Sequence, residues 1–342
     1  MIKFLKKFWY ILLLVLLIDG FFIYVCTKKS NKDITTPGGL SEVESLIEVE
    51  NQNIIKGSIN TIYVYSIEKA TIFQSFIASK DKTTEVSDND IKFNLSKEEN
   101  ELSGKIQKNQ SIEACLICAY NSAMKRNSNI KLSYTYAGLI VYTYEINQKN
   151  LKVGDIIYQI KSKNTIHNKD NPKDLYNAYN NLSVGDVIYY KRGTELKKFV
   201  LEEALDYYGK KNYFFVYDKY SIDYTNAVPN FTLYPSKTSG PSGGLLQTLS
   251  VYSQVSGIDY TFGKKITGTG TISIDGLVGP IGGIEQKVIT ALRNNADIFI
   301  CPKSQYQDAY KRWVKLRGHK NMKLIAVSTF DELIERLGEI YA

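Results

Sequence analysis

Residues 239–257 read SGPSGGLLQTLSVYSQVSG, and residues 264–301 read KKITGTGTISIDGLVGPIGGIEQKVITALRNNADIFIC. In the first stretch, small residues precede an apolar stripe that starts at Leu245, which predicts a helix ending by Gly257. Ser242 therefore lies at the N-terminus of a predicted helix. Free backbone N–H groups at such a position can receive a developing oxyanion, and the surrounding glycines let a peptide come close.

Lys287 lies in the second stretch, on an apolar helical stripe formed with Ile284, Val288 and Ala291. A lysine there is partly desolvated, and moving its pKa from about 10.4 to near 7 costs roughly 4 to 5 kcal/mol, which suggests a function. A serine hydroxyl needs an adjacent base, and neither His167 nor His319 lies in a motif-like setting. The alternative is a lysine that snorkels from the helix flank.

Both stretches resemble the proteolytic domain of Lon-like proteases, especially the membrane-anchored, PDZ-containing branch. Gly240-Pro241-Ser242-Gly243-Gly244 resembles the family's GPSAG nucleophile loop, with Gly243 in place of the usual alanine. Residues 279–283, GPIGG, followed by Gln286-Lys287, resemble its lysine motif. The resemblance implies Ser242 as nucleophile, Lys287 as base, and Gly240, Pro241 and Gly243 as the nucleophile and oxyanion loop.

Thr269 falls where the family keeps a threonine whose hydroxyl holds the catalytic lysine. The alternative interpretation is that Thr267, Thr269 and Thr271 are one face of a strand. The glycines of this region miss the spacing of a phosphate-binding loop, so we expect tight turns around a substrate cleft, no nucleotide and no cofactor.

Residues 132–205 have a different sequence pattern, which predicts short apolar strands around two glycine turns. The passage LKVGDIIYQIKSKNTI, with Gly154-Asp155 at its turn, resembles a PDZ domain of bacterial proteases. The resemblance implies that a peptide adds as a strand beside residues 136–140, at Gly138, Leu139 and Ile140, with Gly138 leaving room for close approach. The alternative is a small β-domain without a ligand.

Residues 8–26, FWYILLLVLLIDGFFIYVC, are long and apolar enough to cross a bilayer as a helix. Lysines flank them on both sides, and Asp19 interrupts them. We expect a retained anchor, because no A-x-A cleavage site follows. We also expect a cytoplasmic N-terminus and extracytoplasmic C-terminal domains, because a short basic N-terminus normally stays in the cytoplasm while a long following domain is translocated. A cleaved signal peptide is the alternative.

Composition excludes little else. The chain has a net charge of +8, but its basic residues are scattered and part of the excess flanks the apolar segment, so a membrane surface fits better than nucleic acid. Cys115 and Cys118 lie in an apolar helical pattern at 111–126 without a second ligand pair, which favours buried side chains over a metal site.

The predicted fold is α+β: a Lon-type proteolytic domain with an inserted or adjoining PDZ-like β-rich domain, preceded by one transmembrane helix. The predicted divisions are 1–30 for the cytoplasmic stub and anchor, 31–41 for a linker, 42–131 for an α/β segment that packs with the protease domain, 132–205 for the PDZ-like domain, and 206–342 for the proteolytic domain. Within 42–131, residues 54–79 are expected as strands or a strand and a helix, and residues 80–110 as loop.

The expected function is that of an ATP-independent, membrane-anchored serine endopeptidase that hydrolyses unfolded or membrane-proximal polypeptides captured by the PDZ-like unit. Two rival hypotheses remain open. One is a catalytically silent peptide-binding scaffold or adaptor, and the other is acyl transfer from the same acyl-enzyme to an amine. Assembly into a homo-oligomeric ring is an expectation from the resemblance alone.

Overall fold

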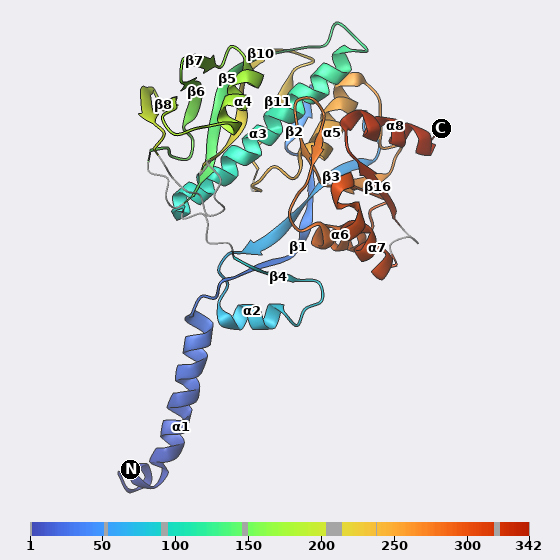
Figure 1. The fold of residues 1–342 in the computed structure, drawn as a ribbon. Helices are drawn as coiled ribbons and strands as arrows, with labels where there is room; N and C mark the ends of the chain where they lie inside the picture. The colour runs from blue at the N-terminus through green and yellow to red at the C-terminus, as the bar shows by residue number, and fades with distance from the viewer. Residues whose placement is uncertain are drawn as a thin grey trace.

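The N-terminal helix α1, Ile2–Thr27, extends away from the rest of the chain (Figure 1). The computed structural model describes residues 2–50, 54–89, 95–145, 150–202, 214–236, 238–317 and 322–341. Within α1, residues 7–27 are long and apolar enough to cross a membrane, and none of this segment is buried against protein. A signal sequence near the N-terminus has the same properties, so this helix is a candidate span.

A six-stranded sheet forms the centre of the larger unit, in the order β16-β15-β12-β3-β1-β4. β3, β12, β15 and β16 run parallel, and β1 pairs antiparallel with β3 and β4. The strands are β1 Lys32–Glu42, β3 Ser58–Ile67, β4 Glu85–Asp88, β12 Lys265–Gly268, β15 Ile298–Pro302 and β16 Lys323–Val327. The sheet therefore joins the first strand of the chain to its last.

Helices cover both faces of this sheet, because its buried strands carry apolar side chains on both sides. One core contains Ile59, Ile266 and Ile300 with residues of α3, α5 and α8, and the opposite core contains Ile62 and Phe299 with residues of α6 and α7. The helices are α3 Lys97–Met124, α5 Gly244–Ser256, α6 Ile284–Arg293, α7 Tyr306–Lys315 and α8 Phe330–Tyr341. Two small antiparallel pairs complete the unit: β2 Ile47–Val49 with β11 Phe231–Leu233, and β13 Thr271–Ile272 with β14 Val278–Gly279.

The predicted linker at residues 31–41 is wrong, because Lys32–Glu42 is strand β1. Pro37-Gly38-Gly39 lies at a bulge between Pro37 and Leu40, where the register shifts. An added Cβ at Gly38 would lie 2.2 Å from the Tyr63 carbonyl oxygen. The turn-like sequence therefore marks a close approach of two strands.

The loop predicted for residues 80–110 is also wrong, since this range contains β4 and the first half of α3. Ser96 and Glu99 form a capping box that starts α3. The helix predicted at 111–126 is confirmed but is only the second half of α3, and Cys115 and Cys118 are buried in it. Residues 54–79 form β3 followed by α2, Ile72–Ala78, as one of the two alternatives predicted.

A smaller β-rich unit lies on one side of α3, and most of the main unit lies on the other side (Figure 1). Its sheet has the order β10-β5-β6-β8-β9, with β7 paired to β6, and one helix, α4, packs on it. The elements are β5 Lys131–Tyr144, β6 Ile156–Ser162, β7 Thr165–Asn168, α4 Pro172–Asn180, β8 Val187–Arg192, β9 Glu195–Val200 and β10 Phe214–Val228. The predicted boundary at 205/206 lies outside the described residues.

The long β5–β10 ladder connects the two units. Its outer part contributes Leu139, Val141 and Phe214 to the core of the β-rich unit, whereas Leu132 and Ile222 belong to the main core. The β-rich unit is therefore an insertion carried on a two-stranded stem, and its interior is separate from that of the sheet.

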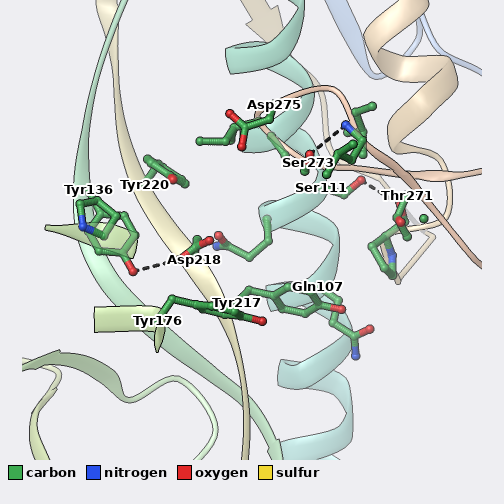
Figure 2. Close-up of a pocket in the computed structure, with 18 of the residues that line it drawn as sticks. Gln107, Ser111, Tyr136, Tyr176, Tyr217, Asp218, Tyr220, Thr271, Ser273 and Asp275 are labelled. Atoms are coloured by element: carbon green, nitrogen blue, oxygen red, sulfur yellow. Dashed lines mark hydrogen bonds between the residues drawn. The ribbon is translucent and has the colours of Figure 1, made fainter. Parts of the chain in front are cut away.

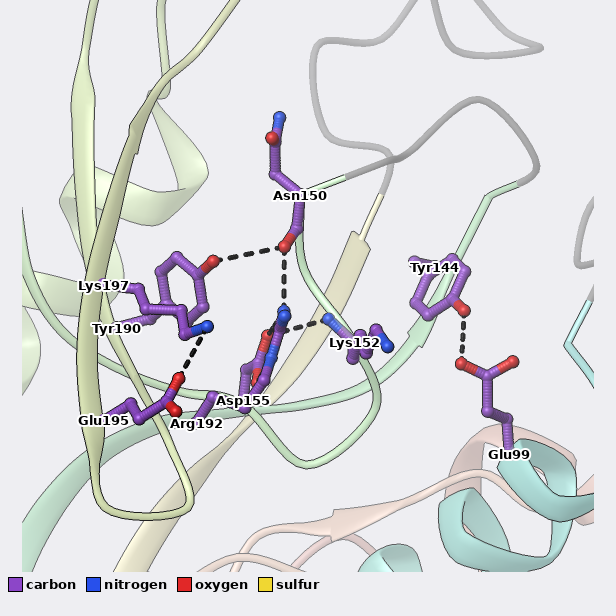
Figure 3. Close-up of polar contacts among 9 residues, drawn as sticks. All are labelled: Glu99, Tyr144, Asn150, Lys152, Asp155, Tyr190, Arg192, Glu195 and Lys197. Carbon is purple, nitrogen blue, oxygen red and sulfur yellow. Dashed lines mark hydrogen bonds and ion pairs between the residues drawn. The ribbon is translucent and has the colours of Figure 1, made fainter.

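The Gly154-Asp155 turn contains an ion pair with a buried carboxylate (Figure 3). The Asp155 side chain is 2% exposed; it accepts two hydrogen bonds from the Arg192 guanidinium, at 2.9 and 2.7 Å, and one from the Lys152 N–H at 2.8 Å. Arg192 also donates to the Asn150 carbonyl oxygen at 2.9 Å. This network ties the loop before β6 to β8, so we assign Asp155 a structural role.

Candidate functional site

Ser242 lies in a tight loop directly before α5, as predicted. Gly240 has φ +82°, which a side chain would strain, and its N–H donates to the Gly104 carbonyl oxygen of α3 at 3.3 Å. The Ser111 hydroxyl of α3 donates to the Pro241 carbonyl oxygen at 3.0 Å. Two hydrogen bonds with helix α3 therefore fix the backbone of the Ser242 loop.

Helix α5 starts at Gly244 and is buried along nearly its whole length, which confirms the helix predicted there. It ends at Gly257, whose left-handed φ of +70° completes the C-cap. In the part of the chain that the structure describes, the backbone N–H groups of Ser242 and Gly243 donate to no protein acceptor. They lie at the positive end of the α5 dipole, where an anion is stabilised.

The Ser242 backbone is fixed by the segment that follows β12. Its carbonyl oxygen accepts from the Gly270 N–H at 2.9 Å and from the Thr269 hydroxyl at 3.0 Å. The Leu245 N–H donates back to the Gly270 carbonyl oxygen at 3.0 Å. Three hydrogen bonds thus join the nucleophile loop to the end of a central strand.

Lys287 comes from α6, on the opposite face of the sheet, and is 2% exposed. Its amine donates to the Thr269 hydroxyl at 3.0 Å. Burial lowers the pKa of Lys287 from 10.5 to about 7, because desolvation disfavours the charged amine. No described carboxylate forms an ion pair with it, so nothing offsets this effect.

Thr269 is the residue that the two predicted catalytic residues share. Its hydroxyl accepts from the Lys287 amine and donates to the Ser242 carbonyl oxygen, and the residue is fully buried. The Lys287 amine does not hydrogen-bond the Ser242 hydroxyl in this structure, and among the described residues that hydroxyl has no partner. Catalytic hydrogen bonds are often long without substrate and tighten only in the complex.

The topology explains how residues so far apart in sequence meet. β12 is a central strand with parallel neighbours, and Thr269 and Gly270 follow its carboxyl end. α5 packs on one face of the sheet and α6 on the other, so the serine loop and the lysine converge at that end. Ligand sites in open parallel sheets lie outside the carboxyl ends of the strands.

Gly243 has a local reason for being a glycine. An added Cβ would lie 2.9 Å from Thr61 Cγ2 and 3.2 Å from Gln247 Nε2. Its φ of −93° is open to any residue, so crowding rather than strain opposes a side chain here.

A groove of about 1090 Å³ opens beside the Ser242 loop (Figure 2). It runs between α4 and the β5–β10 stem on one side and α3 and the β13–β14 turn on the other, and Pro241 lines one end. Five tyrosines line it, namely Tyr134, Tyr136, Tyr176, Tyr217 and Tyr220. Sequence reasoning missed this groove and Ser111, because the lining residues come from segments that no local motif connects.

The prediction that a peptide strand pairs at Leu139 and Ile140 is wrong. Both residues already pair with Asp218 and Tyr217 of β10 on one edge and with β6 on the other. The close approach at Gly138, φ +132°, is made by β6, because an added Cβ would lie 2.2 Å from the Ile157 carbonyl oxygen. The residues of β5 that line the groove are Tyr134 and Tyr136.

The other candidate ligands lie elsewhere. His167 Nδ1 is 2.8 Å from an Asp174 carboxylate oxygen in the β-rich unit, and His319 lies outside the described residues. Burial raises the pKa of the Cys118 thiol to about 12 and that of Cys115 further, so both stay protonated. Within the described ranges, no group of three His, Cys, Asp or Glu residues is arranged to hold a metal ion.

Residues 218–338 of the chain are similar to part of known proteins. Residues 218–338 match the family model of the Lon protease (S16) C-terminal proteolytic domain. Lon protease of Campylobacter jejuni is 31% identical over 120 residues, which cover 35% of this chain and 14% of that protein. Lon protease 2 of Bacillus subtilis is 32% identical over 98 residues, covering 29% of this chain and 16% of the relative.

Lon protease of Azospirillum brasilense is 31% identical over 96 residues, which cover 28% of this chain and 11% of that protein. The chain thus corresponds to a small part of these relatives' length. The part of the chain that is similar to Lon-type proteolytic domains is residues 218–338. Strands β1, β3 and β4 precede the matched residues yet complete the same sheet.

Proposed function

We propose that the protein is a serine endopeptidase in which Ser242 is the nucleophile and Lys287 the general base. The observation that carries this proposal is the position of Lys287. Its amine is buried, its pKa is lowered to about 7, and it is hydrogen-bonded to a threonine that also holds the Ser242 backbone. Near neutral pH such an amine is half unprotonated, which is the state that accepts a proton.

The proposed reaction starts when the neutral Lys287 amine takes the proton of the Ser242 hydroxyl. The hydroxyl oxygen attacks the carbonyl carbon of the scissile peptide, and the tetrahedral oxyanion forms. The ammonium then gives its proton to the leaving nitrogen, the C–N bond breaks, and an acyl-enzyme remains. Water, deprotonated by Lys287, hydrolyses this ester and restores both side chains.

The free N–H groups of Ser242 and Gly243 are suited to stabilise the oxyanion. They lie at the N-terminus of α5, and removing one donor of such a site typically costs about 10²- to 10³-fold in kcat. Thr269 orients the lysine through its hydroxyl. Gly240 and Pro241 set the bend that presents the serine.

We infer that the tyrosine-lined groove receives the substrate polypeptide and leads it to Ser242. The β-rich unit then acts as the PDZ-like capture module, through the wall formed by α4 and the residues of β5 before Gly138. Aromatic rings offer large contact area at small entropic cost, which suits an extended chain of varied sequence. Unfolded or membrane-proximal polypeptides are the proposed substrates.

Helix α1 is the proposed membrane anchor, with the N-terminus in the cytoplasm and the catalytic unit outside. Proteolysis is proposed to proceed without ATP. Both points are tested by activity of the full chain in vesicles without added nucleotide.

The decisive experiment uses the full chain and a serine-directed phosphonate. We expect labelling and casein cleavage by the wild type and by Ser239→Ala, an exposed serine of the same loop, and neither by Ser242→Ala. The Ser242 hydroxyl has no partner among the described residues, so its removal should leave stability unchanged. Full cleavage by Ser242→Ala would refute the proposed nucleophile. A folded wild type that binds peptide but neither labels nor cleaves would support the scaffold alternative.

A further inference from the structure

Helix α2 presents an apolar face that no described part of the protein covers. Ile72, Phe73, Phe76 and Ile77 are 37%, 40%, 57% and 53% exposed, and they share one side of the helix. The other side packs inward through Ala78, next to Ala70 and Ile34. Large apolar side chains gathered on one side of a helix indicate an interaction surface.

The position of α2 is fixed relative to the end of α1. The Ile72 N–H donates to the Lys28 carbonyl oxygen at 3.0 Å, and the Ser30 N–H donates to the Ala70 carbonyl oxygen at 2.8 Å. The Ser30 and Ser75 hydroxyls are 2.9 Å apart. Because α1 ends at Thr27, the start of α2 lies in space beside the residues that directly follow the apolar segment.

Figure 1 shows that α2 runs across the direction of α1 and lies beside its end. If α1 crosses a bilayer, residues 28–30 lie at the level of the lipid headgroups, and α2 lies along the same level. An interfacial helix carries apolar side chains on one side and lysines at its margins. Lys80 fits this pattern, since its amine lies 5.3 Å from the centre of the Phe76 ring.

We propose that the apolar face of α2, formed by Ile72, Phe73, Phe76 and Ile77, binds the lipid interface and fixes how the catalytic sheet stands above the membrane. This inference rests on the proposed anchoring by α1. It does not depend on the proposed protease chemistry. The hydrogen bonds that hold the start of α2 beside the end of the anchor select a bilayer over a second protein as the occupant.

The test measures tryptophan fluorescence of the full chain in phosphatidylcholine–phosphatidylglycerol vesicles with and without brominated acyl chains. All variants carry Ser242→Ala to prevent self-cleavage and Trp313→Phe to leave Trp9 as the only natural tryptophan. Two further variants carry Trp9→Phe with either Phe76→Trp or Leu196→Trp. Leu196 is the matched control, because it is 71% exposed on β9 of the β-rich unit.

We expect quenching of Trp9, roughly twofold or more quenching at position 76, and none at position 196, because an interfacial helix lies about 5–10 Å into the headgroup and acyl boundary. Quenching of Trp9 without quenching at position 76 would overturn the lipid-binding surface and leave the anchor intact. Unquenched but blue-shifted emission at position 76 would also overturn it, in favour of a protein partner. An unquenched Trp9 would refute the anchoring and this inference with it.

A second measurement needs no introduced tryptophan. Lys80 and Lys82 follow α2. In vesicles, trypsin cleavage after these lysines, read by mass spectrometry, should be several-fold slower in the protein with the natural α2 than in the Phe73→Ser/Phe76→Ser variant. Equal cleavage of the two proteins would contradict the proposal. The control is the Tyr310→Ser/Val314→Ser variant, which is changed on the exposed side of α7. Its cleavage after Lys80 and Lys82 should be as slow as in the protein with the natural α2.

Discussion

The proposed catalytic region and the β-rich unit each bury an ionisable side chain, in opposite ways. Lys287 is 2% exposed with a hydroxyl as its hydrogen-bond partner and no described counter-ion, and its pKa falls to about 7. Asp155 is equally buried but is bonded to the Arg192 guanidinium and a backbone N–H. A buried charge that is paired links parts of the structure. A buried ionisable group without a counter-ion has its pKa shifted toward neutral pH, and this shift lowers the stability of the fold.

The largest effect should come from Lys287→Met. Without the base, casein cleavage should fall by on the order of 10³-fold or more. The same change should raise the free energy of unfolding by about 4 kcal/mol at pH 7 or below, because it removes a buried amine whose pKa lies far below 10.5. Denaturant titration gives the second value, and a loss of stability in the folded variant would contradict the unpaired-charge interpretation.

Asp155→Asn tests whether the paired carboxylate of the β-rich unit stabilises the fold. The pair joins a buried carboxylate to a guanidinium that is 30% exposed, so weakening its hydrogen bonds should cost about 2 kcal/mol. We expect this loss of stability in thermal or urea unfolding, with kcat unchanged for a small amide substrate. Glu195→Gln, which breaks the exposed Glu195–Lys197 pair, should leave stability unchanged and is the control. A drop in kcat for Asp155→Asn would show that the β-rich unit takes part in the chemical step.

Thr269→Val removes the hydroxyl that Lys287 and the Ser242 carbonyl oxygen share. We expect kcat to fall roughly 10- to 100-fold, as for other residues that orient a functional group. Thr269→Ser, which retains the hydroxyl, should recover most of the activity. The orienting role is contradicted if both variants lose activity equally.

The pH dependence should follow Lys287. Activity should rise through an apparent pKa near 7 and fall about tenfold per unit below it, because the base must be neutral. The stability contribution has its own window. The amine is protonated in both states below about 7, so its full penalty applies there, and the penalty is relieved as pH rises from about 7 toward 10.5, where only the unfolded state remains protonated.

The smallest effect should come from the groove. Tyr176→Ala, on the exposed side of α4, should raise KM for a long peptide a few-fold and leave kcat unchanged. Tyr310→Ala on α7 is the matched control. A change in kcat with an unchanged KM would mean that this wall positions the reacting bond instead of binding the chain.

The sequence predicted the local settings of Ser242 and Lys287 better than their surroundings. The positions of Ser242 before a helix and of Lys287 on an apolar stripe are local properties, and the structure has both. The strand at 32–42 was missed because Pro37-Gly38-Gly39 signals a turn, and only the pairing with β3 makes it a bulge. The start of α3 was missed because the first half of this helix is polar, although Ser96 and Glu99 carried a capping signal.

The peptide-binding expectation failed for a different reason. A glycine followed by apolar residues indicates a close backbone contact. The sequence does not say whether that contact is with a bound peptide or with another strand of the same chain. At Gly138 that contact is with β6. The groove could not be predicted either, since its lining residues come from six segments between residue 107 and residue 280.

The strand order of the central sheet has a consequence for biosynthesis. β1 and β3 are made early, whereas their partner β12 and the helix that carries Lys287 are made about 200 residues later, after the whole β-rich unit. The lysine, the serine and the strand end that joins them can come together only when almost the entire polypeptide has left the ribosome. The order of synthesis therefore delays assembly of the proposed catalytic site until the molecule is nearly finished.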